Sequence, residues 1–353
     1  MAKYDISINE IKKVPWDGLQ YSELTLHFKG NNVNTTLLNT LRRVLIDNIP
    51  TYAFPSEKIQ IKKDNNTSKF NNDFMRLHLS QLSIPNIKSD VCYLPPKYWE
   101  GIDYSKDYEK YPQEKQIEIY INSTNTTDVL SRVTTSDIQY YEDGVMIHDK
   151  YNKEYPIVLI ELCPSEKFKC HMVSALGVAE KNIHEGTSIW SSVANAYYDE
   201  TKEGINLTIE SQGQCDEYEL VWKACKYMQA KMEELKNTLL EKQKEARVKK
   251  VELLLDNETY TVGGILTDVI QNRNDVVFAG ITKPNYLVKS ILIKIEYKDE
   301  QDTPYTPIYE SIQYISDIMN YIEKIIYKMG SKYITVTDET VGDQKVKKDK
   351  KKK

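Results

Sequence analysis

The residues that could hold a metal ion are considered first, because cysteine and histidine side chains supply most structural zinc sites. The chain has five cysteines, and no two of them form a Cys-x-x-Cys pair. The local group of Cys163, Cys170 and His171 lacks the four ligands and the short paired spacings of a zinc site. Buried or incidental thiols are the favoured interpretation of this group, and metal binding is the alternative. We therefore expect no metal site.

The patterns typical of common enzymes are missing from the sequence. It contains no Gly-x-Ser-x-Gly, His-Glu-x-x-His, P-loop or paired-carboxylate motif, and its five histidines are dispersed. No Lys-Ser/Thr pair follows Gly263 and Gly264, so a helix start that needs close backbone packing is favoured over a phosphate loop. We expect no catalytic residue and no cofactor in this chain. An enzyme with an unrecognised site is kept as an alternative.

The composition indicates a globular protein without a general affinity for nucleic acid. Of the 353 residues 40% are hydrophobic. There are 47 basic and 52 acidic residues, which gives a net charge of -5. Phosphate binding needs a basic field, so a role near DNA would act through partners or a local patch. The start of the chain has no apolar signal core, and no stretch is apolar enough to span a bilayer. We expect a soluble, intracellular protein.

Hydrophobic periodicity predicts two units with the same order of elements: strand, helix, strands and a long helix. In the first unit a strand at 22–28 precedes a helix at about 34–48 that ends before Pro50, because proline disfavours a helical residue before it. A short helix is expected at 74–82 and an irregular, loop-rich segment at 86–155. Further strands are expected at 155–162, 168–178 and 205–211, and the long helix at 217–247. The second unit has strands at 252–255, 276–281 and 291–297, with helices at about 262–270 and 307–329.

Each long helix carries an apolar ridge with steps of four and three residues, a period of 3.5 that is typical of helices paired along a seam. Each buried Ile, Leu or Met there would contribute about 1.5–3 kcal/mol. We expect the two ridges to pair inside one chain, joined by the opening helices in a four-helix contact with the sheets outside. The alternative is a coiled-coil adaptor whose ridges bind external helices. The expected seam comprises Leu41, Leu45, Val221, Cys225, Met228, Met232, Leu235, Leu239, Ile308, Ile312, Ile315, Met319, Ile322 and Ile326.

The charged stretch 241–250 marks the expected boundary between the two units. The first unit takes residues 1–50 and 190–250, and residues 51–189 form an insert domain within it. The second, smaller unit takes residues 251–334. Residues 335–353 end in KVKKDKKKK and are expected to form a disordered basic tail. A solubilising role is favoured for this tail over contact with nucleic acid or acidic partners.

Several motifs in the same order resemble the RNA polymerase alpha family. The first is Asn39-Thr40-Leu41-Arg42-Arg43 on the opening helix, followed by Ile49-Pro50. A second is the stretch 71–85, a short helix that runs into Ile84-Pro85. A third is the stretch 169–179, followed by Trp190. The first unit is similar to the third-largest subunit of eukaryotic polymerase II. The stretches 258–266 and 277–284 are similar to the eleventh subunit of that enzyme, so the chain resembles a fusion of the two, as in large cytoplasmic DNA viruses.

The resemblance implies an α+β fold with two alpha-like dimerisation modules paired through long helices, and a loop-rich, mostly β insert domain in the first. It implies a non-catalytic assembly subunit of a DNA-directed RNA polymerase that scaffolds the two large catalytic subunits. Asn39, Arg42 and Arg43 would contact the beta-like subunit, since the planar arginine fork suits carboxylates and carbonyls. A solvated pair of arginines is the alternative. The relatives' cysteine cluster is not carried over, because Cys92 stands alone in the insert's corresponding part.

The resemblance also implies partners and a location. The partners would be the beta-like and beta-prime-like large subunits and the small tenth- and twelfth-type subunits, with DNA contacted only indirectly. Neither a membrane nor a homodimer is expected. In a viral setting the location would be the host cytoplasm, in the virus factory, and the virion.

Overall fold

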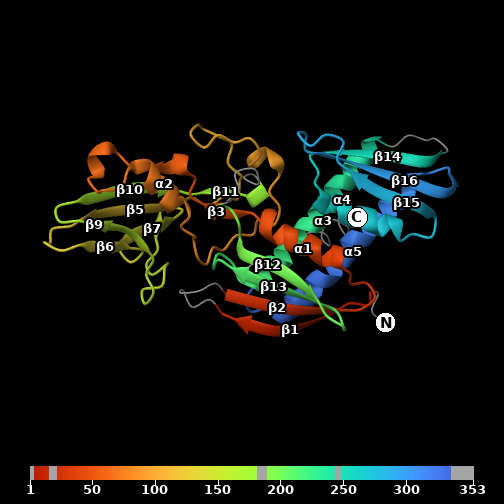
Figure 1. Cartoon of the computed structure of the whole chain (residues 1–353), viewed down its shortest axis with the longest axis horizontal. Helices are drawn as coiled ribbons and strands as arrows, with labels where there is room; N and C mark the ends of the chain where they lie inside the picture. The colour runs from red at the N-terminus through yellow and green to blue at the C-terminus, as the bar shows by residue number, and fades with distance from the viewer. Residues whose placement is uncertain (1–3, 16–21, 181–188, 243–247, 335–353) are drawn as a thin grey trace, which may run out of the picture.

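The computed structural model describes residues 4–15, 22–180, 189–242 and 248–334 of the chain. The fold is α+β, as expected from the sequence. The molecule is elongated, with a β-rich lobe at one end and the long helices with two further sheets at the other (Figure 1). Among the described residues, no helix combines the length and the apolar character that crossing a membrane requires. The expected basic tail, residues 335–353, lies outside the described residues.

A four-stranded antiparallel sheet is built from two distant parts of the sequence. The alternation predicted at 22–28 is confirmed, because Leu24, Leu26 and Phe28 are fully buried on one face. Leu26 pairs with Leu207, so the chain leaves this sheet after residue 29 and returns near residue 193. The sequence pattern does not predict bounds for the first strand or for the strand at 193–200. The strands in spatial order are β1 (Ser7–Val14), β2 (Ser22–Lys29), β13 (Ile205–Ser211) and β12 (Val193–Glu200).

Helix α1 (Thr35–Asp47) begins and ends where the sequence predicts. The Asn34 side chain accepts a hydrogen bond from the Leu37 amide at 2.8 Å and so caps the first turn. The helix ends at Asn48, two residues before Pro50. Its apolar face is buried, and it packs against β12 and the helices described below.

The lobe between β2 and β12 contains more regular structure than expected. Residues 86–116 are largely irregular, but four strands lie within 117–146, and this corrects the loop-rich prediction for that part. Ile117, Ile119 and Ile121 alternate and are buried, a local signal that the prolines and tyrosines of the whole segment obscure. The helices are η1 (Ser56–Lys58), η2 (Lys63–Asn65), α2 (Asn72–Ser80) and η3 (Pro96–Tyr98).

The strands of this lobe form one large sheet and two small ones. The five-stranded sheet has the order β4-β10-β5-β7-β8, and the pairs β6-β9 and β11-β3 complete the lobe. The strands are β3 (Thr51–Ala53), β4 (Ile59–Gln60), β5 (Ile117–Thr124), β6 (Ser131–Thr134), β7 (Ile138–Glu142), β8 (Val145–Met146), β9 (Val158–Leu162), β10 (Lys167–Val173) and β11 (Ala175–Gly177).

The remaining elements follow β13. The long helix α3 (Glu217–Lys242) comes first, and a three-stranded sheet of order β14-β16-β15 then carries two helices. Strand β14 begins at residue 248, so the end of the charged stretch 241–250 is strand and not linker. The elements of this part are β14 (Val248–Asp256), α4 (Tyr260–Gln271), β15 (Val276–Thr282), β16 (Ser290–Gln301) and α5 (Thr306–Gly330).

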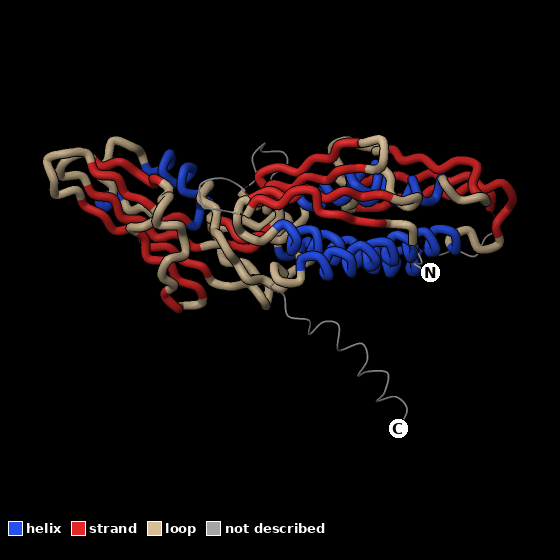
Figure 2. Tube along the Cα trace, turned by 90° about the horizontal axis from the view of Figure 1, so that it is seen from below, coloured by secondary structure: helices blue, strands red, loops and turns tan. Residues whose placement is uncertain are grey.

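Four helices meet at the centre of this end of the molecule. Helix α3 packs along α5, α1 contacts α3 and α4, and α4 contacts α5. Figure 2 shows the long helices side by side, with strands beyond them. Their buried side chains belong to one large core that spans residues 4–49 and 193–334. A second core lies between residues 52 and 178. The domain boundaries drawn from the sequence stay a prediction.

Candidate functional site

The two apolar ridges face each other between α3 and α5. At one end of the contact, Gly330 of α5 lies against Tyr218 of α3. In the middle, Glu323 of α5 binds Lys226 at 3.0 Å and Gln229 at 2.9 Å, both on α3. The late residues of one helix thus meet the early residues of the other, so the helices run antiparallel. Every residue of the expected seam is at most 4% exposed: Leu41, Leu45, Val221, Cys225, Met228, Met232, Leu235, Leu239, Ile308, Ile312, Ile315, Met319, Ile322 and Ile326.

The polar contact at Glu323 is a feature that the hydrophobic pattern does not reveal. Glu323 is 8% exposed, and its two oxygens bind side chains of the facing helix. A carboxylate buried among apolar residues is tolerated only where partners meet it. A shift of α5 along α3 would leave this carboxylate without them, so the contact fixes the register of the helices.

The face of α1 that points away from the core carries the three residues expected at an interface. Asn39, Arg42 and Arg43 are all partly exposed. The Arg42 guanidinium donates from Nε and Nη2 to Asn39 Oδ1, at 3.0 and 2.9 Å. Among the described residues no carboxylate lies within ion-pair distance of Arg42. The guanidinium is therefore held in place by a neutral group, and its charge is left for another partner.

Arg43 has a different environment one residue later. Its Nη2 atom lies 3.7 Å from Asp47 Oδ2, a loose ion pair one turn along the helix. Its Nε atom is buried and has no hydrogen-bond acceptor among the described residues. Burial raises the pKa of Asp47, and Arg43 opposes this increase only in part. A buried donor without an acceptor is costly, so Arg43 would gain from a further partner.

A buried ionic junction joins α3 to both neighbouring parts of the chain. Lys231 of α3 binds Glu258, which precedes α4, at 2.8 Å, and Glu234 at 3.0 Å. Tyr93, in the loop region before β5, donates to Glu234 at 2.5 Å. Burial alone would lower the pKa of Lys231, but the charge of Glu258 and the hydrogen bond to it, together with Tyr93 and Glu234, outweigh burial and raise the pKa. The charged form is thus retained, and the junction fixes the Tyr93 loop and the second sheet to the same helix. Sequence spacing gave no signal for it.

The cysteines and histidines considered as metal ligands do not converge. Cys170 and His171 are neighbours on β10 and therefore point to opposite faces of the sheet. Burial raises the pKa of the Cys170 thiol to about 12. His171 lies on the other face of the sheet. Its Nε2 atom is 2.9 Å from Glu118 Oε2, and its ring stacks on Tyr120. Within the described ranges, no three His, Cys, Asp or Glu side chains are grouped so that they could hold a metal ion.

The two adjacent glycines of α4 differ in their surroundings. A Cβ atom on Gly263 would collide with the terminal methyl groups of Ile281 and Ile291 on the sheet, so Gly263 is closely packed as expected, and a larger residue would force these side chains to shift. A Cβ on Gly264 would meet no atom within 4 Å. The expectation of close packing is therefore wrong for Gly264.

Comparison with known proteins identifies the family of the chain. The model of the RNA polymerase Rpb3/Rpb11 dimerisation domain matches residues 27–232, which include α1 and most of α3. A protein of Acanthamoeba polyphaga mimivirus, whose name describes it as a putative DNA directed RNA polymerase subunit, is 25% identical over 351 residues. That alignment covers 93% of this chain and 95% of the mimivirus protein. The chain therefore belongs to the Rpb3/Rpb11 dimerisation domain family of RNA polymerase subunits, and its role is in DNA-directed RNA polymerase.

Proposed function

We propose that this chain is a non-catalytic assembly subunit that scaffolds the two large catalytic subunits of a multisubunit polymerase. Its two halves act as an alpha-like pair within one polypeptide. The burial of the α3 and α5 ridges against each other is the observation that carries this proposal. The family is described by its Rpb3/Rpb11 dimerisation domain. In this proposal the second partner of the pair is the part of the same chain that carries α4 and α5. No homodimer is then needed to cover the ridges.

The beta-like large subunit docks on the outer face of α1, at Asn39, Arg42 and Arg43. Two observations support this choice of surface. Asn39 holds the Arg42 guanidinium in a fixed position without neutralising it. Among the residues that the structure describes, the buried Nε of Arg43 has no acceptor, and its one carboxylate partner lies at 3.7 Å. Preorganised guanidinium groups form bidentate contacts with carboxylates at a small loss of side-chain entropy.

The remaining partners are also proposed, on the basis of the resemblance to alpha-like subunits. The beta-prime-like subunit and small subunits of the tenth and twelfth types complete the assembly around this chain, and DNA is contacted only through them. The mimivirus relative supports a viral protein. As part of the proposal, such a protein acts in the cytoplasm of the host, in the virus factory, and is packaged in the virion.

The coiled-coil adaptor is the alternative that the helix contact disfavours. An adaptor needs a free apolar ridge, whereas the ridge residues of α3 and α5 are at most 4% exposed. Binding of an external helix would require α3 and α5 to separate and expose a large apolar surface to water.

Purification of the tagged full-length chain from its native setting tests the proposal. We expect the beta-like and beta-prime-like subunits to co-purify in near-equal amounts and the complex to elongate RNA. The isolated chain should show no turnover. Recovery of the chain without large subunits would refute the assembly role, and turnover by the isolated chain would favour an enzyme.

A further inference from the structure

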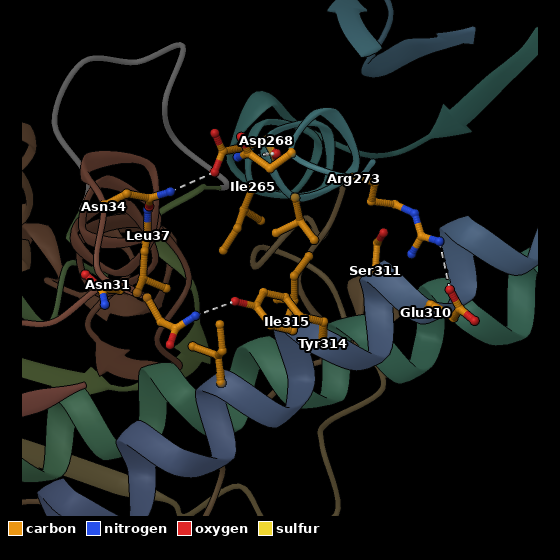
Figure 3. Close-up of a pocket in the computed structure, with 14 residues that line it drawn as sticks. Asn31, Asn34, Leu37, Ile265, Asp268, Arg273, Glu310, Ser311, Tyr314 and Ile315 are labelled. Atoms are coloured by element: carbon orange, nitrogen blue, oxygen red, sulfur yellow. Dashed lines mark hydrogen bonds and ion pairs between the residues drawn. The ribbon is translucent and has the colours of Figure 1, made fainter. Parts of the chain in front are cut away.

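A groove that the sequence did not predict opens between the start of α1, helix α4 and the first half of α5 (Figure 3). Its volume is about 650 Å³. The apolar part of its lining comes from both halves of the chain: Leu37, Ile265, Val269, Ile315 and Ile318. The groove therefore exists only when the two halves are packed together.

The rim of the groove is polar and already ordered. Asn34, which caps α1, also donates from Nδ2 to Asp268 Oδ2 at 2.8 Å (Figure 3). Asn32 donates to the Tyr314 hydroxyl at 2.9 Å. These bonds cross from the loop before α1 to α4 and α5, so they hold the rim without filling the groove.

The charge of the rim is negative. Arg273 is shared between Glu310, at 2.9 Å, and Asp275, at 2.9 and 3.1 Å. Asp268 receives only the neutral Asn34 amide, and no cation among the described residues lies within ion-pair distance of it. Of the described charged side chains that line the groove, Arg273 is the one cation and Asp268 and Glu310 are the two carboxylates, so an occupant with a positive charge would be attracted to this rim.

We propose that this groove binds a segment of another polymerase subunit in which an apolar side chain lies next to a lysine or arginine. The apolar side chain fills the space over Val269 and Ile315, and the cation reaches Asp268. The Asn31 carboxamide is exposed at the rim and has no hydrogen-bond partner among the described residues, so it can bond the backbone of the segment. This inference rests on the proposed assembly function and adds a second docking site to the outer face of α1.

Photo-crosslinking within the assembled polymerase tests the groove directly. A benzophenone amino acid replaces Asn272, an exposed rim residue, in the tagged full-length chain. We expect a crosslink to one peptide of another subunit that contains an apolar residue beside lysine or arginine. The same probe at the exposed Val277 on β15, which does not line the groove, should not label that peptide. Crosslinks only to residues 335–353 of this chain, or none in an assembled complex, would overturn the proposal.

Two variants make the test specific to charge and to apolar contact. Asp268→Asn keeps an oxygen acceptor for Asn34 but removes the charge, and should reduce the crosslink about two- to fivefold and weaken its salt dependence. Val269→Asp places a carboxylate where the apolar side chain lies and should reduce it about tenfold or more. Asp299→Asn, on an exposed strand position, is the matched control and should change nothing.

These outcomes separate the groove from the assembly role. If the large subunits fail to co-purify with the unmodified chain, the proposed function itself is wrong. If they co-purify and the crosslink is absent, or is unaffected by Val269→Asp, only the groove proposal is wrong. Thermal unfolding of each variant checks that α4 remains folded, because both substituted side chains are partly exposed.

Discussion

Gly330, in the last turn of α5, lies directly against the ring of Tyr218, in the first turn of α3. A Cβ atom at position 330 would be 2.7 Å from Tyr218 Cδ1 and closer still to Cγ. Tyr218 is 1% exposed and stacks on Tyr333, with ring centroids 5.7 Å apart. The absence of a side chain at position 330 thus lets the end of one long helix approach the start of the other.

The substitution Gly330→Ala should therefore destabilise the protein although alanine favours helix. The added methyl group must displace a buried ring, and overpacking of this kind costs about 1–3 kcal/mol. Thermal or denaturant unfolding measures the effect. Gly264→Ala is the matched control, because open space surrounds that position in α4, and it should stabilise the protein by about 0.5–1 kcal/mol. Equal effects of the two changes would contradict the close contact at Tyr218.

The substitution Ile315→Asp should disrupt the packing of α3 on α5. Ile315 is 1% exposed in the middle of the α5 ridge, so the new carboxylate would be buried without a partner. We expect a loss of more than about 4 kcal/mol, in the range that single substitutions rarely reach. Ile315→Val, which only shortens the side chain, should cost about 0.5–1.5 kcal/mol. An unchanged melting temperature for Ile315→Asp would show that the ridge is exposed in solution.

The long-range order of the elements could be predicted because it depends on periodicity and on strong stops such as Pro50. The helix ridges have a repeat of 3.5 residues, and a stripe of that kind must be buried somewhere. The strands at 117–146 escaped detection because Ile117, Ile119 and Ile121 lie within a segment whose average composition suggests loops. The alternation within 117–121 is the local signal for the first of these strands.

The contacts that fix geometry could not be predicted, because they join residues far apart in the sequence. Tyr93, Lys231 and Glu258 meet only after α3 has packed against two other parts of the chain. Asn34 is recognisable as a helix cap, but its second bond to Asp268 depends on the crossing of α1 and α4. The groove at this crossing therefore has no local sequence signal.

A pH dependence is expected from Glu142 in the β-rich lobe. Burial raises the pKa of Glu142, but hydrogen bonds from Lys150 and Tyr140, with the positive charges of Lys150 and Lys115, outweigh burial and leave the pKa below its usual 4.5. A lowered folded-state pKa means that the carboxylate stabilises the fold above about pH 4.5 and loses this effect as the pH falls through the folded value. Glu142→Gln should lower the melting temperature at about pH 6, and the difference from the parent protein should shrink toward about pH 3.

The control for this measurement is Glu154→Gln in the same lobe. Glu154 is exposed, and its carboxylate has no side-chain partner among the described residues. Its substitution should leave the melting temperature nearly unchanged at both pH values. A constant difference between Glu142→Gln and the parent protein across this range would mean that packing, and not charge, accounts for the role of Glu142.

The double substitution Arg42→Ala and Arg43→Ala should separate assembly from folding. Both side chains lie off the buried face of α1, and within the described part of the chain their bonds are those to Asn39 and the loose pair with Asp47. Partly exposed positions of this kind contribute little to folding, so the melting temperature should change by about 2–4 °C at most. Co-purification of the beta-like subunit should fall about tenfold or more, because the truncated groups would leave their partners unpaired.

Two further variants show whether the loss concerns this surface and the shape of the guanidinium. Arg132→Ala removes an exposed arginine of β6 that pairs with Glu161 at 3.0 Å, and should leave assembly intact. Replacing Arg42 and Arg43 by lysine keeps the charge but removes the planar fork, and should restore only part of the binding. Full recovery with lysine would reduce the contact to simple charge attraction. Unchanged co-purification of the double alanine variant would show that the large subunit does not bind at this face of α1.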